Sequence, residues 1–151
     1  MHTTVSLPEG IKIKEIYKVD PSQGQALPFF VASVSAGFPS PAEDYIEKKL
    51  DLNALLVKHP AATFFVRVEG NSMEGANIFS GDILIVDKSL KPKNNNIVVA
   101  VINGEFTVKR IHLQEGKLFL MPENNRFPPL EVKEEMDFQV WGVVAHVIHA
   151  V

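Results

Sequence analysis

From Thr63 to its end, the chain is a series of short β-rich runs separated by tight-turn signals. Asn103-Gly104, between two of these runs, is typical of a two-residue β-hairpin. Glu115-Gly116 and Ser80-Gly81 are further turn candidates. The strands that this pattern predicts are residues 63–68, 83–86, 97–102, 105–112, 117–121 and 138–148. Many short strands with close turns predict a mainly β domain, a compact rolled sheet or barrel-like sheet with a short helical segment.

The first forty or so residues have a different character. Prolines and glycines are dense there, at positions 8, 10, 21, 24, 28, 37, 39 and 41. Proline at this density favours an extended arm over a packed element, although Ile11 and Ile13 alternate with lysines as in a short strand. We therefore predict a flexible N-terminal arm over residues 1–40 and a β-rich domain over residues 41–151. No helix-turn-helix pattern can be placed before Pro39.

Two short helices are predicted where the arm ends. Ser40-Pro41-Ala42-Glu43 has the form of a capping box with proline at the first helical position. It predicts a helix over residues 41–49. Asp51 can cap a second helix over residues 52–58, which stops before Pro60.

Composition excludes several classes of protein. The 151 residues suffice for one domain and a tail, and they include no cysteine. Disulfides, thiolate metal sites and thiol nucleophiles are thereby excluded. A net charge of −3 argues against strong direct DNA binding. The longest apolar run, residues 97–102, is far short of the roughly 20 residues that span a membrane, and the N-terminus resembles no secretory signal, so we expect a cytoplasmic protein.

Ser72 is the first candidate for chemistry. It lies just past a predicted strand, in a turn opened by Gly70. Glycine allows backbone N–H groups to converge beside the serine, as an oxyanion site requires. The alternative is a solvated serine in a turn that ends a strand, because Ser and Gly are common in turns.

Lys109 is the second candidate. Period-2 alternation places Thr107, Lys109 and Ile111 on one face of a strand whose other face is also apolar. A lysine buried there would have a lowered pKa, and in its neutral form it could take the proton of a serine hydroxyl. The alternative is a lysine whose ammonium reaches solvent with its stem along the strand.

The histidines suggest no better site. His146 and His149 lie three apart in a predicted strand, on opposite faces. His59 precedes a proline at a predicted helix end, His112 ends a predicted strand, and nothing in the sequence selects a Ser-His-Asp triad. We expect no metal and no cofactor.

Taken together, the motifs resemble the catalytic domain of the LexA/UmuD family, self-cleaving serine–lysine proteases related in fold to signal peptidase. The resemblance covers the chain from about Ala32 to its end. It rests on 35–42 (SAGFPSPA), 59–66 (HPAATFFV), 70–73 (GNSM), 80–87 (SGDILIVD), 104–110 (GEFTVKR) and 140–144 (VWGVV).

The resemblance implies a role for five residues. Ser72 matches the nucleophile of the family, and Lys109, 37 residues later, matches its general base. Ala36-Gly37 matches the bond that is cut. Backbone N–H groups near Asn71 and Ser72 would hold the oxyanion.

The resemblance also implies partners. A RecA filament on single-stranded DNA would promote self-cleavage, the chain would form a homodimer, and the shortened product would join a UmuC-like polymerase for translesion synthesis in the SOS response. Two alternatives stay open: a LexA- or phage-type repressor, and a non-catalytic module that binds a polymerase. A signal peptidase is disfavoured because no membrane anchor is evident.

This chain departs from the family in places. Asn71 and Asn96 stand where acidic residues are common, and the turn at residues 94–96 has asparagine where glycine is frequent. Asparagine tolerates the left-handed conformation, so we expect the turn to be kept.

Overall fold

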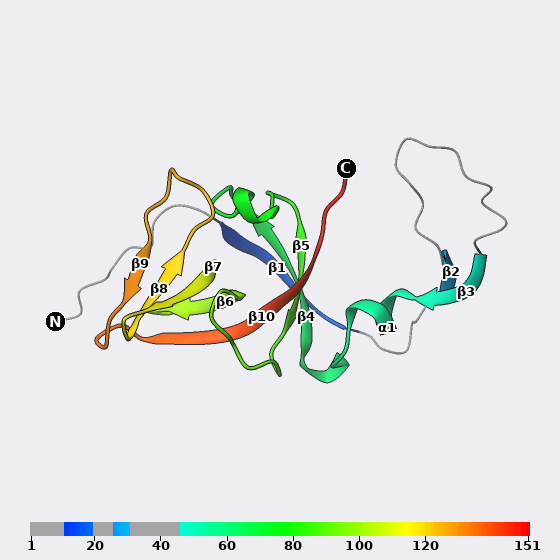
Figure 1. Ribbon diagram of the computed structural model, residues 1–151, viewed down its shortest axis with the longest axis horizontal. Coiled ribbons are helices and arrows are strands. Elements are labelled where there is room, and N and C mark those ends of the chain that lie inside the picture. The colour runs from blue at the N-terminus through cyan, green and yellow to red at the C-terminus, as the bar shows by residue number, and fades with distance from the viewer. Residues whose placement is uncertain (1–10, 20–25, 31–45) are drawn as a thin grey trace. The chain divides into compact units, whose positions relative to one another are not determined.

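The computed structural model describes residues 11–19, 26–30 and 46–151, and the chain divides into two compact units (Figure 1). One unit contains residues 11–19 and 61–151, and the other the described residues between 20 and 60. The predicted boundary near residue 40 stays a prediction, and Ala36-Gly37 lies outside the described residues.

The larger unit is an eight-stranded antiparallel sheet in the order β1-β4-β5-β10-β6-β7-β8-β9. Its strands are β1 (Lys12–Lys18), β4 (Thr63–Glu69), β5 (Ile83–Asp87), β6 (Ile97–Ile102), β7 (Glu105–Gln114), β8 (Lys117–Met121), β9 (Leu130–Val132) and β10 (Phe138–Ile148). Two short 3-10 helices, η3 (Pro60–Ala62) and η4 (Glu74–Ala76), flank β4. The six strands predicted after Thr63 are confirmed, and the sequence missed only the three-residue β9 among the described strands there.

Tight turns set the register of the hairpins. Asn103 and Gly104, at φ 49° and 83°, join β6 to β7, and Glu115 and Gly116, at φ 51° and 75°, join β7 to β8. Positive φ at both turn residues matches the right-handed twist of the strands. Asn95, at φ 72°, takes the left-handed conformation expected in the turn before β6.

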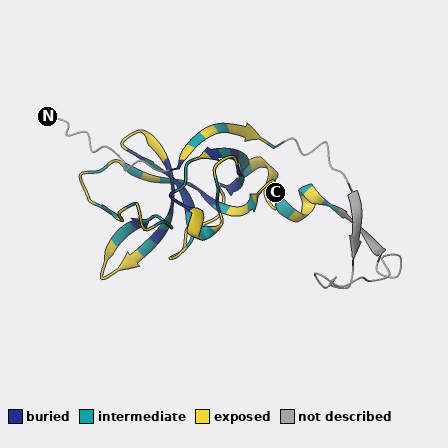
Figure 2. Ribbon diagram, turned by 90° about the horizontal axis from the view of Figure 1, so that it is seen from above, coloured by how far each residue is buried: buried dark blue, intermediate teal, exposed yellow. Residues whose placement is uncertain are grey.

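The sheet rolls without closing. β1, at one edge, pairs with β4 and also lies against β7, which is several strands away in the sheet order. Figure 2 shows the buried residues gathered along the inside of these strands. The main cluster comprises Ile11, Val66, Val68, Met73, Ile78, Leu84, Val86, Val99 and Val108. The mainly β rolled sheet expected from the sequence is confirmed.

The smaller unit pairs β2 (Ala26–Phe30) with β3 (Ile46–Asp51), antiparallel, and continues into the helix α1 (Leu52–Leu56). The side chain of Asp51 accepts a hydrogen bond of 3.0 Å from the Asn53 N–H, so the predicted cap is confirmed. The helix predicted over residues 41–49 is wrong for residues 46–49, which are strand. Pairing with residues 26–30, distant in sequence, satisfies this backbone and overrides the local helix signal.

Candidate active site

Ser72 lies in the turn between β4 and η4. Gly70, at φ 110°, reverses the chain at the end of β4, a conformation that side chains rarely adopt. The reversal carries Ser72 back under the sheet, where its exposed fraction is 0%. The alternative of a solvated turn serine is therefore wrong.

Lys109 extends from the middle of β7 to meet Ser72. Its register partner on β6 is Val98, and its exposed fraction is 7%. Lys109 Nζ donates a hydrogen bond of 3.0 Å to Ser72 Oγ. The alternative of a lysine that reaches solvent is wrong as well.

Burial changes the acidity of this lysine. Desolvation disfavours the charged ammonium and lowers the pKa of Lys109 from 10.5 to about 8. No carboxylate is ion-paired with Lys109 among the described residues to oppose this effect. A substantial fraction of the side chain is therefore neutral in mildly alkaline solution, where it can accept a proton.

Two consecutive peptide groups at Ser72 are held in one orientation. The Asn71 carbonyl accepts a hydrogen bond of 2.8 Å from Asn124 Nδ2, and the Ser72 carbonyl accepts one of 2.8 Å from the Glu123 N–H. Because a peptide is planar and trans, the N–H groups of Ser72 and Met73 point away from residues 123–124. Both N–H groups therefore face away from the same segment, as two donors to one developing oxyanion would.

The segment 123–124 also joins the serine turn to β7. The Gly75 N–H donates a hydrogen bond of 2.7 Å to the Glu123 carbonyl, whose oxygen would lie 2.6 Å from a Cβ at position 75. Arg110 Nε donates to Glu123 Oε1 over 2.5 Å, and Arg110 directly follows Lys109. Nothing in the sequence indicated this link, because residues 123 and 124 are distant in sequence from both candidates.

A backbone group of the N-terminal strand completes the surroundings of Ser72. The Ile11 N–H donates a hydrogen bond of 3.0 Å to Ser72 Oγ, and Ile11 is 4% exposed. The alternation of Ile11 and Ile13 indicated a strand here, and the structure confirms it. Nothing in the sequence indicated that this strand begins at the candidate nucleophile.

The histidines and carboxylates outside the serine–lysine pair were the other candidates for a site. No group of three or more His, Cys, Asp or Glu residues there could hold a metal ion. His146 lies on β10, and His149 Nδ1 lies 2.5 Å from Asp82 Oδ1. Within the described part of the chain, no helix is long and apolar enough to cross a membrane.

A rolled β-sheet with a buried serine and lysine in contact is the architecture of a class of serine peptidases, and sequence comparison agrees. The Peptidase S24-like family model matches residues 28–145. The chain belongs to this family, and its relatives place it among the UmuD-like members of the LexA/UmuD group.

The relatives are similar over most of their length. Protein SamA of Salmonella typhimurium strain LT2 is 48% identical over 130 residues, which are 86% of this chain and 89% of SamA. Protein MucA of Salmonella typhimurium is 45% identical over 126 residues, 83% of this chain and 86% of MucA. The LexA repressor of Hahella chejuensis is 39% identical over 125 residues, 81% of this chain and 62% of the repressor.

Proposed function

We propose that this chain is a self-cleaving serine endopeptidase that cuts its own Ala36-Gly37 bond, with Ser72 as nucleophile and Lys109 as general base. The observation that carries the proposal is the hydrogen bond of 3.0 Å between Lys109 Nζ and Ser72 Oγ. A serine hydroxyl is a weak nucleophile unless a base is within hydrogen-bond reach. Burial supplies a lysine that is a competent base, with a pKa of about 8.

The reaction would proceed in two stages. Neutral Lys109 takes the proton of Ser72 Oγ, which attacks the carbonyl carbon of Ala36 and forms a tetrahedral intermediate. The oxyanion is held by backbone N–H groups; the sequence suggested those of Asn71 and Ser72, and the peptide orientation favours Ser72 and Met73. Charged Lys109 then gives its proton to the amine of Gly37 as the C–N bond breaks.

Water completes the hydrolysis. Neutral Lys109 takes a proton from a water molecule, which attacks the acyl carbon on Ser72. Collapse of this second intermediate breaks the bond to Ser72 Oγ, which regains its proton from Lys109. The products are residues 1–36 with a new carboxylate and residues 37–151 with a new amino group. The serine–lysine pair is one of the variants that perform the chemistry of the Ser-His-Asp triad.

The resemblance to UmuD-like proteins extends the proposal to the cell. A RecA filament on single-stranded DNA would promote the cut in the cytoplasm as part of the SOS response. The processed chain would act as a homodimer and as an accessory subunit of a UmuC-like translesion polymerase. The similarity to MucA, SamA and ImpA over more than four-fifths of their length supports this role.

The test is intact-mass analysis of the purified full chain after incubation. One sample is held at about pH 10, where Lys109 is neutral without an activator, and a second is held at neutral pH with a RecA filament. We expect two masses, for residues 1–36 and 37–151. Ser72→Ala should lower the rate by at least ~10³-fold. The control Ser89→Ala, at an exposed serine, should cut like wild type. A wild type that stays whole in both samples would refute the proposal.

A further inference from the structure

The N-terminal strand β1 covers the candidate nucleophile. The Ile11 N–H contacts Ser72 Oγ at 3.0 Å, immediately before β1 begins at Lys12. Ser72 is 0% exposed, so no carbonyl carbon, that of Ala36 included, can reach its Oγ until the start of β1 moves aside. The start of β1 is therefore part of the wall of the site.

Apolar side chains anchor β1 in the core. Ile11 belongs to the same buried cluster as Val66, Val68 and Met73, and Ile13 packs against that cluster. Val66 and Val68 lie on β4, whose edge β1 covers from Lys12 opposite Glu69 to Lys18 opposite Phe64. Without β1, this edge of β4 and the apolar surface around Ile11 would face solvent.

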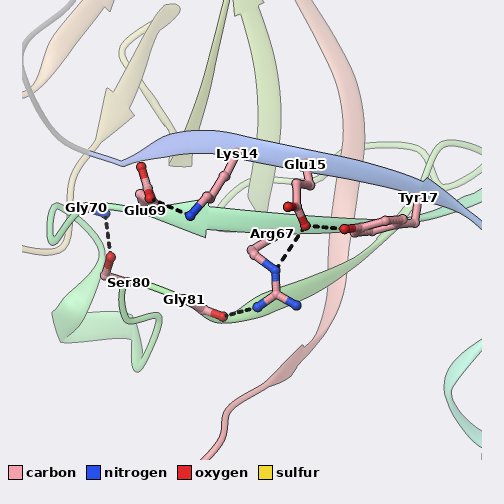
Figure 3. A network of polar contacts seen from close by, with 8 residues as sticks. All are labelled: Lys14, Glu15, Tyr17, Arg67, Glu69, Gly70, Ser80 and Gly81. Carbon is pink, nitrogen blue, oxygen red and sulfur yellow. Dashed lines mark hydrogen bonds and ion pairs between the residues drawn. The ribbon is translucent and has the colours of Figure 1, made fainter.

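Charged pairs fix the outer face of the same strand (Figure 3). Lys14 Nζ lies 3.2 Å from Glu69 Oε1, and Arg67 Nε lies 3.2 Å from Glu15 Oε2. Arg67 also donates a hydrogen bond to the Gly81 carbonyl. Exposed pairs add little affinity, but paired opposite charges on β1 and β4 disfavour a shifted register.

The proposed cut would separate β1 from the part of the chain that it contacts. β1 lies in the piece on the N-terminal side of Ala36-Gly37, yet all the contacts above join it to the piece on the other side. Hydrolysis at residue 36 breaks none of them. It only converts a tethered piece into a separate one, which is then held by the pairing of β1 with β4 and by that of β2 with β3.

We propose that the fragment 1–36 remains bound after the cut, with β1 docked on the edge of β4 and Ile11 again covering Ser72. The docking surface is the β4 edge together with the apolar cluster around Val66, Val68 and Met73. This is strand addition to a sheet edge, in which backbone hydrogen bonds provide affinity and alternate side chains provide specificity. Retention of the fragment after self-cleavage rests on the proposed function, whereas the docking of β1 on β4 does not.

Retention of the fragment 1–36 also controls access to Ser72 in the processed chain. A processed chain whose Ser72 is still covered cannot act on other polypeptides until β1 leaves. The start of β1 therefore moves aside for the cut at Ala36 and covers Ser72 again afterwards.

The test makes the cut without using Ser72. The recognition sequence of an unrelated site-specific protease is inserted between residues 36 and 37 of the full chain, and the purified protein is nicked. Denaturing mass spectrometry verifies two pieces, and gel filtration and native mass spectrometry at micromolar protein measure whether they stay together. We expect one complex of both pieces. Elution of residues 37–151 free of the fragment would overturn the proposal.

Two matched variants locate the contact. Ile13→Asp places a charge against the core cluster, whereas Ile16→Asp places the same charge on the same strand at a side chain that is 40% exposed. Both variants keep the pairing of β2 with β3, and we expect Ile13→Asp, weakened at β1, to lose the fragment at least ~10-fold faster than wild type and Ile16→Asp to keep it. Equal retention by the two nicked variants would contradict docking through this face. Circular dichroism before nicking verifies that both are folded.

A fluorophosphonate probe measures the exposure of Ser72 in the same samples. Nicked Ile13→Asp should label faster than nicked wild type, because loss of β1 uncovers Oγ. Equal labelling would overturn the covering role of Ile11. If neither nicked wild type nor the nicked variants label even at about pH 10, the proposed serine chemistry is refuted. The docking of β1 is then still decided by the retention measurement.

Discussion

Lys109 Nζ and Ser72 Oγ are joined by a hydrogen bond of 3.0 Å between two buried side chains. They come from elements distant in sequence, the middle of β7 and the turn after β4. The burial that brings them together also lowers the pKa of Lys109 to about 8. Folding therefore creates the base and positions it in one step.

Lys109→Met should abolish self-cleavage and raise stability. Methionine has similar length but no charge, so the variant avoids the desolvation that lowers the pKa of Lys109. We expect the free energy of unfolding at pH 7 to rise by about 1–3 kcal/mol in urea denaturation. Lys117→Met, at an exposed lysine, is the control and should change little. A less stable Lys109→Met protein would contradict a costly buried ammonium.

The same lysine should make stability depend on pH. Its pKa is about 8 when folded and 10.5 as the ordinary value, so between these pH values the unfolded chain binds a proton that the folded chain lacks. Unfolding then takes up protons, and wild type gains stability as pH rises through this window. The stability difference between Lys109→Met and wild type should therefore narrow from pH 8 to 10.5 in parallel urea titrations. A constant difference would refute the lowered pKa.

Asn124→Ala should slow the cut without moving its pH dependence. The variant loses the hydrogen bond that orients the Asn71 carbonyl, and with it the alignment of the Ser72 N–H. We expect a rate loss of about 10- to 100-fold, with the pH midpoint unchanged because Lys109 is untouched. Asn125→Ala, at the exposed neighbour, is the control. A shifted midpoint would indicate that Asn124 acts through the base instead.

Gly75→Ala should disturb the serine turn. The new Cβ would lie 2.6 Å from the Glu123 carbonyl oxygen and 3.3 Å from its carbon, and backbone cannot move aside cheaply. We expect a loss of about 1–3 kcal/mol in unfolding free energy and slower self-cleavage. Glu74→Ala, in the same turn with an exposed side chain, should leave both nearly unchanged. Thermal unfolding and intact mass give the two readouts, and a Gly75→Ala protein as stable and active as wild type would rule out this close contact.

Local sequence signals predicted most of the sheet. Period-2 runs and positive-φ turns act within a few residues, so β6, β7 and β8 and their hairpins could be read directly. The resemblance to a known family singled out Ser72 and Lys109, which the structure brings into contact. The alternation in β7 had already indicated that Lys109 could be buried.

Long-range contacts could not be predicted in this way. Residues 46–49 carry a local helix signal but pair with residues 26–30. The start of β1 is separated from Ser72 by 61 residues, and a backbone N–H leaves no mark in the choice of amino acid. The same holds for the carbonyl contacts of residues 123–124, which depend on the rolled sheet being formed first.

The role of Lys109 as the base for Ser72 is tested most directly by the pH–rate profile of self-cleavage, measured by intact mass from pH 6 to 10. If Lys109 activates Ser72, the rate of appearance of residues 1–36 and 37–151 rises through one ionisation with a midpoint near the Lys109 pKa of about 8 and then levels off. We expect no such cut in Lys109→Met. A rate independent of pH over this range, or a cut at the same bond in Lys109→Met, would contradict the claim that Lys109 activates Ser72.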